Sequence, residues 1–239
     1  MTNLNVLSGG AAQGLVASLA ESFRERCGFD IAGEFGAVGA MAARLRQGAK
    51  VDLVILTSAL IADLAREHLL ARASITDVGR VETALAVRAA DPPLSVDDVA
   101  SLRDALLGAD AIFVPDTKSS TAGIHVAKVL QQLGIADAVA TRLKIHPNGA
   151  TAMRHLAESN AARPIGCTQS TEIINTEGVK LSGPLPRGCD LSTLYTAAIA
   201  TAASYPRQAQ ALADLLTNAE QQEMRARAGF LDDRNQLQS

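Results

Sequence analysis

The chain has 239 residues, of which 48% are hydrophobic and 20% charged, and its formal net charge is −3. This composition supports a packed core and excludes a disordered chain. The length indicates one large or two small α/β domains. The small net charge gives no general attraction to nucleic acid or anionic lipid, so neither is an expected partner and any anion must bind locally.

The cysteines and the N-terminal residues bear on the compartment. Cys27, Cys167 and Cys189 are odd in number and lack the spacing of a metal site, so we expect no metal. A disulfide of Cys27 or Cys189 is the alternative, but unpaired thiols are favoured, and they indicate a reducing compartment. The glycine loops match neither GxGxxG nor GxxxxGK(S/T), so no nucleotide and no other cofactor is expected. There is no signal-peptide pattern at the start and no apolar run of membrane-spanning length, so no membrane insertion is expected. As written, the chain is predicted to be cytoplasmic, or periplasmic if a signal peptide has been removed.

Short apolar segments alternate with amphipathic ones along the first third of the chain. Strands are predicted at residues 4–8, 31–35 and 51–56. The helix between the first two ends at Cys27, with Gly28 as its cap, and a second helix runs to Gly48. The order βαβαβ is typical of a doubly wound parallel sheet.

A second α/β unit is predicted after a strand at residues 81–87. Its strands lie at residues 111–115, 142–145 and 164–168, with helices starting near Thr121 and Asn148. Residues 194–200 are predicted as a return strand, and residues 206–228 as one helical run. We therefore predict two doubly wound α/β lobes joined by a two-strand hinge, with a ligand cleft between them. Lobe 1 is residues 1–83, lobe 2 is residues 84–193, and residues 194–239 return to lobe 1.

Four loops combine a strand end, small or hydroxylated residues and a helix start: residues 8–13, 36–40, 117–123 and 147–151. Ligands of open α/β sheets bind beyond the carboxyl ends of the strands, where helix N-termini present free N–H groups to anions. Each loop alone is also compatible with an ordinary tight turn. Together they predict a small anionic ligand bound by Ser8, Gly9, Gly10, Ala11, Ala37, Val38, Gly39, Thr57, Lys118, Ser119, Ser120, Thr121, Ala122, Asn148, Gly149, Arg154, Thr168 and Gln169.

In these segments the sequence resembles the molybdate-binding proteins of ABC transporters. The similar stretches are residues 4–13, 35–48, 51–55, 121–124, 164–166 and 227–230. The resemblance covers most of the chain and implies the type II periplasmic binding-protein fold, with an ABC permease as partner if the protein is exported. Where that family has serines in its first two loops and a tyrosine in the second lobe, this chain has Ala11, Ala37 to Gly39, and Gln169. The loss of hydroxyl donors favours a small organic carboxylate over molybdate or tungstate.

Two other functions remain open. Aconitate isomerase resembles the same family, so the chain is also compatible with a cytoplasmic isomerase or lyase of an unsaturated di- or tricarboxylate. A proton shift in such an acid needs an acid/base group, for which His125 and Asp116 are the candidate catalytic residues. A third hypothesis is a ligand-sensing module, because effector domains of some transcription regulators share this fold.

Overall fold

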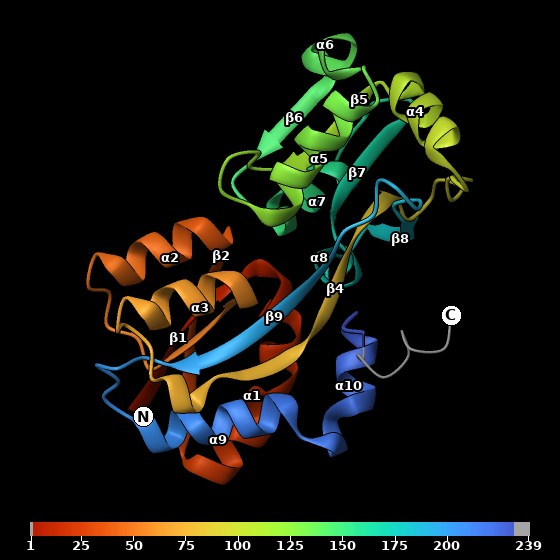
Figure 1. The fold of residues 1–239 in the computed structure, drawn as a ribbon. Coiled ribbons are helices and arrows are strands. Elements are labelled where there is room, and N and C mark those ends of the chain that lie inside the picture. Colours follow the sequence, from red (N-terminus) through yellow and green to blue (C-terminus); the bar gives the residue numbers. More distant parts are fainter. Residues whose placement is uncertain (1, 232–239) are drawn as a thin grey trace. The chain divides into compact units, whose positions relative to one another are not determined.

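The computed structural model describes residues 2–231, shown in Figure 1. The chain divides into two compact units: unit 1 is Met1–Val81 with Thr193–Ser239, and unit 2 is Glu82–Ser192. The chain leaves unit 1 within β4 (Thr76–Arg88) and re-enters it at the start of β9 (Ser192–Ile199). Unit 2 is therefore an uninterrupted insertion into unit 1.

The sheet of unit 1 has the strand order β2-β1-β3-β9-β4. β1 (Thr2–Gly9) pairs in parallel with β2 (Phe29–Gly36) and β3 (Leu53–Thr57), whereas β9 is antiparallel to β3. Figure 1 shows α2 and α3 on one side of this sheet and α1 and α9 on the other. The helical segments of the unit are η1 (Gly10–Ala12), α1 (Gln13–Cys27), α2 (Val38–Arg46), α3 (Ser58–Arg66), η2 (Arg72–Ser74), α9 (Pro206–Thr217), η4 (Ala219–Gln221) and α10 (Gln222–Arg227).

Helices on both sides explain why the strands of unit 1 are apolar on both faces. Leu53, Val54, Ile55 and Leu56 are consecutive residues of β3, and all are 0% exposed. A strand buried on both faces reads as a continuous hydrophobic run rather than an alternating one. The three strands expected in this unit are confirmed as β1, β2 and β3. The expected cap of α1 is also confirmed, because Gly28 has φ 68° and donates its N–H to the Arg24 carbonyl.

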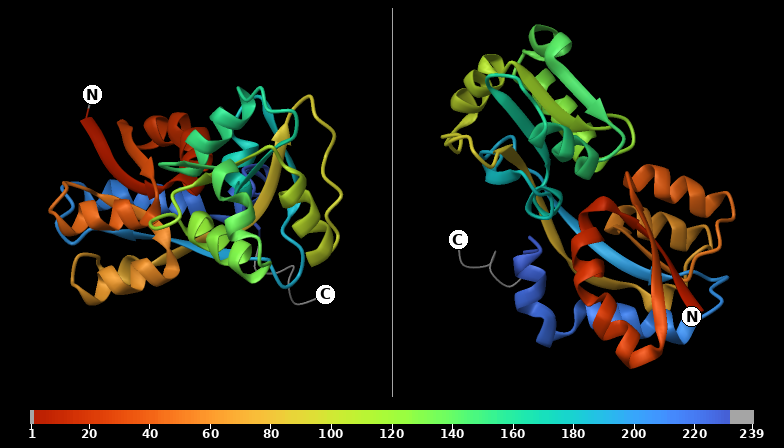
Figure 2. Two further views of the ribbon diagram at one scale, coloured as in Figure 1. Left: turned by 90° about the horizontal axis from the view of Figure 1, so that it is seen from above. Right: turned by 180° about the vertical axis from the view of Figure 1, so that it is seen from behind.

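The sheet of unit 2 has the order β4-β7-β5-β6, and β8 (Val179–Pro184) also pairs with β4. β5 (Ala111–Pro115) is parallel to β6 (Leu143–His146) and to β7 (Pro164–Gln169), and β4 is antiparallel to β7. The helical segments are α4 (Val99–Gly108), α5 (Thr121–Gln132), α6 (Ala136–Val139), η3 (Ala140–Arg142), α7 (Gly149–Ala157) and α8 (Ser170–Ile174). Figure 2 shows the same elements from above and from behind.

The two faces of the unit 2 sheet carry different cores. On one face, which we call the α5 face, Leu85 and Cys167 pack with Val126 of α5. On the other, the α7 face, Ala84 packs with Met153 and Leu156 of α7. Successive residues of a strand point to opposite faces, so β4 and β7 supply both cores.

The C-terminal helical run differs from its prediction. It was expected as one helix over residues 206–228, but α9 ends at Thr217 and α10 begins at Gln222. Asn218 has extended backbone, and its side chain accepts a hydrogen bond from the Gln221 amide (2.9 Å), which starts a new turn. The single-helix prediction was wrong because this asparagine is an N-cap.

Candidate functional site

The predicted loops of unit 1 lie side by side at the carboxyl edge of its parallel strands. Gly9 at the end of β1 is the register partner of Gly36 in β2, and Ser8 is the partner of Ile55 in β3. The segments that follow these strand ends are Gly10 and Ala11 in η1, Ala37 to Gly39 at the start of α2, and Thr57 before α3. The structure therefore brings together all the residues of unit 1 that we predicted to contact ligand.

The unit 1 edge is closely packed around Gly9. A Cβ atom on Gly9 would lie 2.7 Å from Val38 Cγ1 and 3.0 Å from Tyr195 Cε1. Ser8 is fully buried and donates its hydroxyl to the Gly9 carbonyl (2.9 Å). Tyr195, which the sequence did not single out, is the register partner of Thr57 and so helps to form this edge.

The N-cap residues of the helices that start at this edge make no side-chain cap within the described part of the chain. The N-cap residues are Ala37 for α2 and Thr57 for α3, and neither helix receives a side-chain cap from residues 2–231. The first amides of a helix have no partner within the helix and carry its positive dipole end. An anionic ligand can supply the missing acceptor.

The predicted loops of unit 2 also meet at one carboxyl edge. Pro115 at the end of β5 pairs with His146 at the end of β6, and Phe113 pairs with Gly166 in β7. The loops that follow these strands hold the predicted residues Lys118, Ser119, Ser120, Thr121, Ala122, Asn148, Gly149, Thr168 and Gln169. Arg154 joins this edge through a hydrogen bond from Nη2 to Thr151 Oγ1 (3.0 Å) in the first turn of α7.

Asp116 organises the loop between β5 and α5. Its Oδ1 accepts from the amides of Lys118 (2.9 Å) and Ser119 (2.6 Å) and from the Ser119 hydroxyl (2.8 Å). The Ser119 hydroxyl and the Lys118 amide hold the pKa of Asp116 below its usual range, which makes this carboxylate a weak base. Lys118 is exposed, and α5 begins after Ser120 without a capping side chain from the described residues.

The second candidate catalytic residue, His125, also has a structural partner. Its Nε2 lies 2.7 Å from the Cys189 carbonyl oxygen, so Nε2 carries the proton and donates it to that oxygen. The bond ties α5 to the loop before β9. Both candidate catalytic residues thus have structural hydrogen bonds, through His125 Nε2 and Asp116 Oδ1, and their catalytic roles stay a prediction.

Several polar side chains of unit 2 have buried atoms without a hydrogen-bond partner among the described residues, and Gln169 and Thr83 are two of them. Both amide atoms of Gln169 and the hydroxyl of Thr83 have none among the described residues, although Gln169 is 3% exposed and Thr83 is 1% exposed. They are register partners in β7 and β4, so their side chains lie next to each other on the same face. Buried polar groups normally have partners, which makes this pair a candidate ligand contact. Thr83 was not predicted, because a lone threonine within an apolar strand gives no signal.

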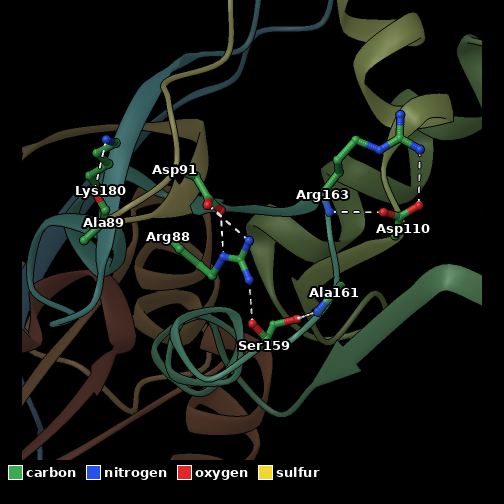
Figure 3. Close-up of polar contacts among 8 residues, drawn as sticks. All are labelled: Arg88, Ala89, Asp91, Asp110, Ser159, Ala161, Arg163 and Lys180. Atoms are coloured by element: carbon green, nitrogen blue, oxygen red, sulfur yellow. Dashed lines mark hydrogen bonds and ion pairs between the residues drawn. The ribbon is translucent and has the colours of Figure 1, made fainter.

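The opposite edge of unit 2 has charged side chains that pair with one another. Figure 3 shows Arg88 at the end of β4 bound to Asp91 and to the Ser159 carbonyl oxygen. Arg163, which precedes β7, contacts Asp110, which precedes β5, and the Arg163 side chain holds the pKa of Asp110 below its usual range. These charges are committed to the fold, so they offer little to a ligand.

The described part of the chain shows no group of three or more His, Cys, Asp or Glu side chains placed to hold a metal ion. Within residues 2–231, no helix has the length and apolar character needed to cross a membrane. Cys27, Cys167 and Cys189 are free thiols.

Comparison with known proteins identifies the family of this chain. A family model described as "Bacterial extracellular solute-binding protein" matches residues 4–231. The chain belongs to this family. Among solved structures, this solute-binding protein is similar to the periplasmic molybdate-binding protein of Azotobacter vinelandii, with a TM-score of 0.78 and 18% identity over 96% of this chain and 99% of that chain.

The chain is also similar to a sulfate-binding protein and to an aconitate isomerase. The sulfate-binding protein SubI from Mycobacterium tuberculosis H37Rv has a TM-score of 0.76 and 17% identity, covering 99% of this chain and 89% of its own. These likenesses confirm the predicted type II periplasmic binding-protein fold. A curated sequence, aconitate isomerase from a Pseudomonas species, is 25% identical over 228 residues, which is 91% of this chain and 83% of the isomerase.

Proposed function

We propose that this solute-binding protein binds a small organic carboxylate through the loops at the carboxyl edges of its two sheets. The observation that carries the proposal is that α2, α3 and α5 each begin at such an edge without a capping side chain from residues 2–231. Amides at these positions are ready-made donors for a negatively charged group. That the loops of both units hold one ligand stays a prediction.

Side-chain chemistry supports a carboxylate as the anion. The unit 1 edge offers the buried apolar side chains of Ala37 and Val38, which suit the carbon skeleton of an organic acid. Unit 2 offers the exposed ammonium group of Lys118 beside the N-terminus of α5. The molybdate- and sulfate-binding proteins show that the fold accommodates inorganic oxyanions, so those ions are the main competitors.

A melting screen tests the proposal. The native protein is heated with molybdate, sulfate, aconitate isomers, citrate and other carboxylates. A ligand that binds only the folded state stabilises it by about 2.7 kcal/mol at a concentration 100 times its Kd, which raises Tm by several degrees. We expect the largest shift with an organic carboxylate. The proposal is wrong if every carboxylate leaves Tm unchanged, or if an inorganic oxyanion raises it most.

Substitution of Lys118 tests the polar loop of unit 2. Lys118→Ala should weaken carboxylate binding by about 5-fold, the typical effect of losing one exposed charged partner. Lys128→Ala is the matched control, because Lys128 is exposed farther along α5 and its loss changes the net charge equally. Isothermal titration of both variants measures the effect. Equal affinities for the two variants would remove Lys118 from the site.

A second function, isomerisation of an unsaturated di- or tricarboxylate, is favoured by the similarity to aconitate isomerase. For the proton shift, the groups not engaged by the hydrogen bonds described above would act: Nδ1 of His125 or Oδ2 of Asp116. Proton NMR of the protein with cis- or trans-aconitate distinguishes the functions, because an isomerase converts one isomer into the other. Binding without conversion supports the solute-binding function.

The proposed partner and location follow from the family. We propose that the protein acts outside the cytoplasm, as the family description suggests. We also propose that it delivers its ligand to an ABC permease, as is supported by the similarity to the substrate-binding domain of a molybdenum ABC transporter from Clostridium difficile. The competing proposal is a cytoplasmic protein that acts without a permease. Cell fractionation of the native host decides between the two.

A further inference from the structure

The N-terminus of α7 is occupied by side chains of the protein itself. Asn148, the N-cap residue, accepts a hydrogen bond from the Thr151 amide through Oδ1 (2.8 Å). The carboxyl group of Glu172 lies against the amides of Gly149 and Ala150. A Cβ atom on Gly149 would lie 1.9 Å from Glu172 Oε2, so only glycine allows this approach. The first amides of α7 are therefore already satisfied.

Glu172 reaches this position from a second helix. It is the third residue of α8, whose N-cap is Gln169, and from there a glutamate can return to the N-cap amide. Its carboxyl group also lies against the Gln169 amide, and it accepts a 2.5 Å hydrogen bond from Thr168 Oγ1. A single buried carboxyl group thus serves two helix N-termini on the α7 face.

The α5 face of the same sheet has the opposite character. The described residues provide no capping side chain for α5. Gln169 lies two residues after Cys167 in β7, and Thr83 lies two residues before Leu85 in β4. Residues two apart in a strand point to the same face, so both side chains point to the face on which Cys167 and Leu85 pack with α5. Both side chains are more than nine-tenths buried, and neither has a hydrogen-bond partner among residues 2–231.

We infer that unit 2 binds its ligand on the α5 face alone, with an anionic group at the N-terminus of α5 and a hydroxyl group at Gln169 and Thr83, while Asn148 and Glu172 close α7 to anions. The inference rests on the proposed function and names the ligand class as a hydroxycarboxylate.

The hydrogen-bonding capacity of Gln169 explains the preference for a hydroxyl group. Its side chain presents one acceptor oxygen and a two-proton donor nitrogen, and Thr83 adds a group that both donates and accepts. A ligand hydroxyl can donate to one and accept from another. A deprotonated tetrahedral dianion such as molybdate only accepts, and so leaves the Gln169 oxygen unsatisfied. Closure of α7 removes a further set of amides that such a dianion needs.

Calorimetry with matched probes tests the inference on the full chain. The pairs malate and succinate, and citrate and tricarballylate, differ by one hydroxyl group at equal charge. We expect the hydroxylated member of at least one pair to bind the native protein at least 10-fold more tightly. Gln169→Ala should reduce that ratio to below about 3-fold. If the ratio is near one in the native protein, or unchanged in Gln169→Ala, the inference is wrong.

Substitution of Asn148 tests the closure of α7. Asn148→Ala frees the Thr151 amide while Glu172 still holds the amides of Gly149 and Ala150, so it should raise the affinity for sulfate or molybdate about 3-fold. Asn148→Gly provides a second variant that folds more readily, because glycine at an N-cap costs only a few tenths of a kcal/mol. Asp98→Ala is the matched control, since Asp98 caps the distant helix α4 in the same unit and its loss should leave every affinity unchanged.

The outcomes separate this inference from the proposed function. If sulfate and molybdate affinities do not rise in either Asn148 variant, or rise equally in Asp98→Ala, the closure of α7 is refuted while carboxylate binding still stands. If none of the carboxylates or oxyanions binds the native protein, the proposed function fails and the inference fails with it.

Discussion

The carboxyl edges of the two sheets are built from the same elements but present different chemistry. In unit 1, small or apolar residues such as Gly9, Ala37 and Val38 leave mainly backbone amides at the strand ends. In unit 2, the same edge carries Lys118, Gln169 and the buried carboxyl group of Glu172. The difference suggests that unit 1 supplies general affinity for anions, whereas unit 2 distinguishes one anion from another.

The largest expected effect is a loss of stability when a methyl group is added at a closely packed glycine of each edge. In unit 2, a Cβ atom on Gly123 would lie 2.2 Å from the backbone oxygen of Asp116, which cannot move without disturbing β5. Gly123→Ala should therefore destabilise the protein by about 3 kcal/mol. In unit 1, the neighbours of Gly9 are the side chains of Val38 and Tyr195 rather than backbone atoms, and the contacts are longer, so Gly9→Ala should cost less, about 1 kcal/mol.

Urea unfolding of both variants measures this contrast. Gly108→Ala is the control, because a Cβ atom there meets nothing closer than Arg163 Nη1 at 3.8 Å. Alanine at the end of α4 should leave stability unchanged or slightly higher. If Gly9→Ala lowered the free energy of unfolding as much as Gly123→Ala does, the two edges would be equally rigid, contrary to this prediction.

A smaller effect is expected in the pH dependence of stability. Burial raises the pKa of Glu172 above its ordinary value of 4.5, and the Thr168 hydroxyl and nearby amides only partly oppose the shift. The unfolded chain then releases this proton at lower pH than the folded protein does. Stability contributed by the protonated carboxyl is complete below about pH 4.5 and is lost as pH rises through the folded value. Glu172→Gln should remove that part of the decline.

Chemical denaturation between pH 4 and 8 measures the difference between the native protein and Glu172→Gln. Asp98→Asn is the control, and it should leave the profile between pH 4 and 8 unchanged in slope. Hydrogen bonds from Ser101 lower the pKa of Asp98 below 3.8, so its contribution is lost only when pH falls through that lowered value. A native protein and a Glu172→Gln variant with parallel pH profiles would show that Glu172 is not desolvated in unit 2.

The smallest effect is a difference in thiol labelling between the units. Burial raises the pKa of Cys167 in unit 2 to about 12, and only the thiolate reacts. Cys27 in unit 1 is only partly buried. At pH 8 an alkylating reagent should therefore label Cys27 and leave Cys167 unmodified in the folded protein. Mass spectrometry of the digested protein identifies the labelled peptide, and rapid labelling of Cys167 would contradict the packing of the α5 face.

Much of the fold could be predicted because local patterns determine it. Continuous apolar runs marked β3 and β5, and Gly28 marked the end of α1. Helices α3 and α4 and strand β8 were not predicted, although Asp98 and Ser101 form a capping box that signals the start of α4. The break before α10 was also missed, and Asn218 is the residue that signals it.

The candidate site was less predictable because its decisive contacts join distant parts of the chain. Glu172 three residues after Gln169 is a local capping signal that could have been noticed. Its approach to Gly149, 23 residues earlier in the sequence (172 − 149), depends on how α7 packs against α8. The proximity of Thr83 to Gln169 likewise depends on the pairing of β4 with β7, which no local pattern specifies.

The place of β9 in unit 1 has a consequence for synthesis on the ribosome. This strand sits between β3 and β4, yet it is made only after the whole of unit 2 has emerged. Until β9 is made, the edges of β3 and β4 that pair with it stay uncovered. Unit 2 is contiguous in sequence and can complete its own core before that. We expect unit 2 to be the first part to resist protease on stalled nascent chains.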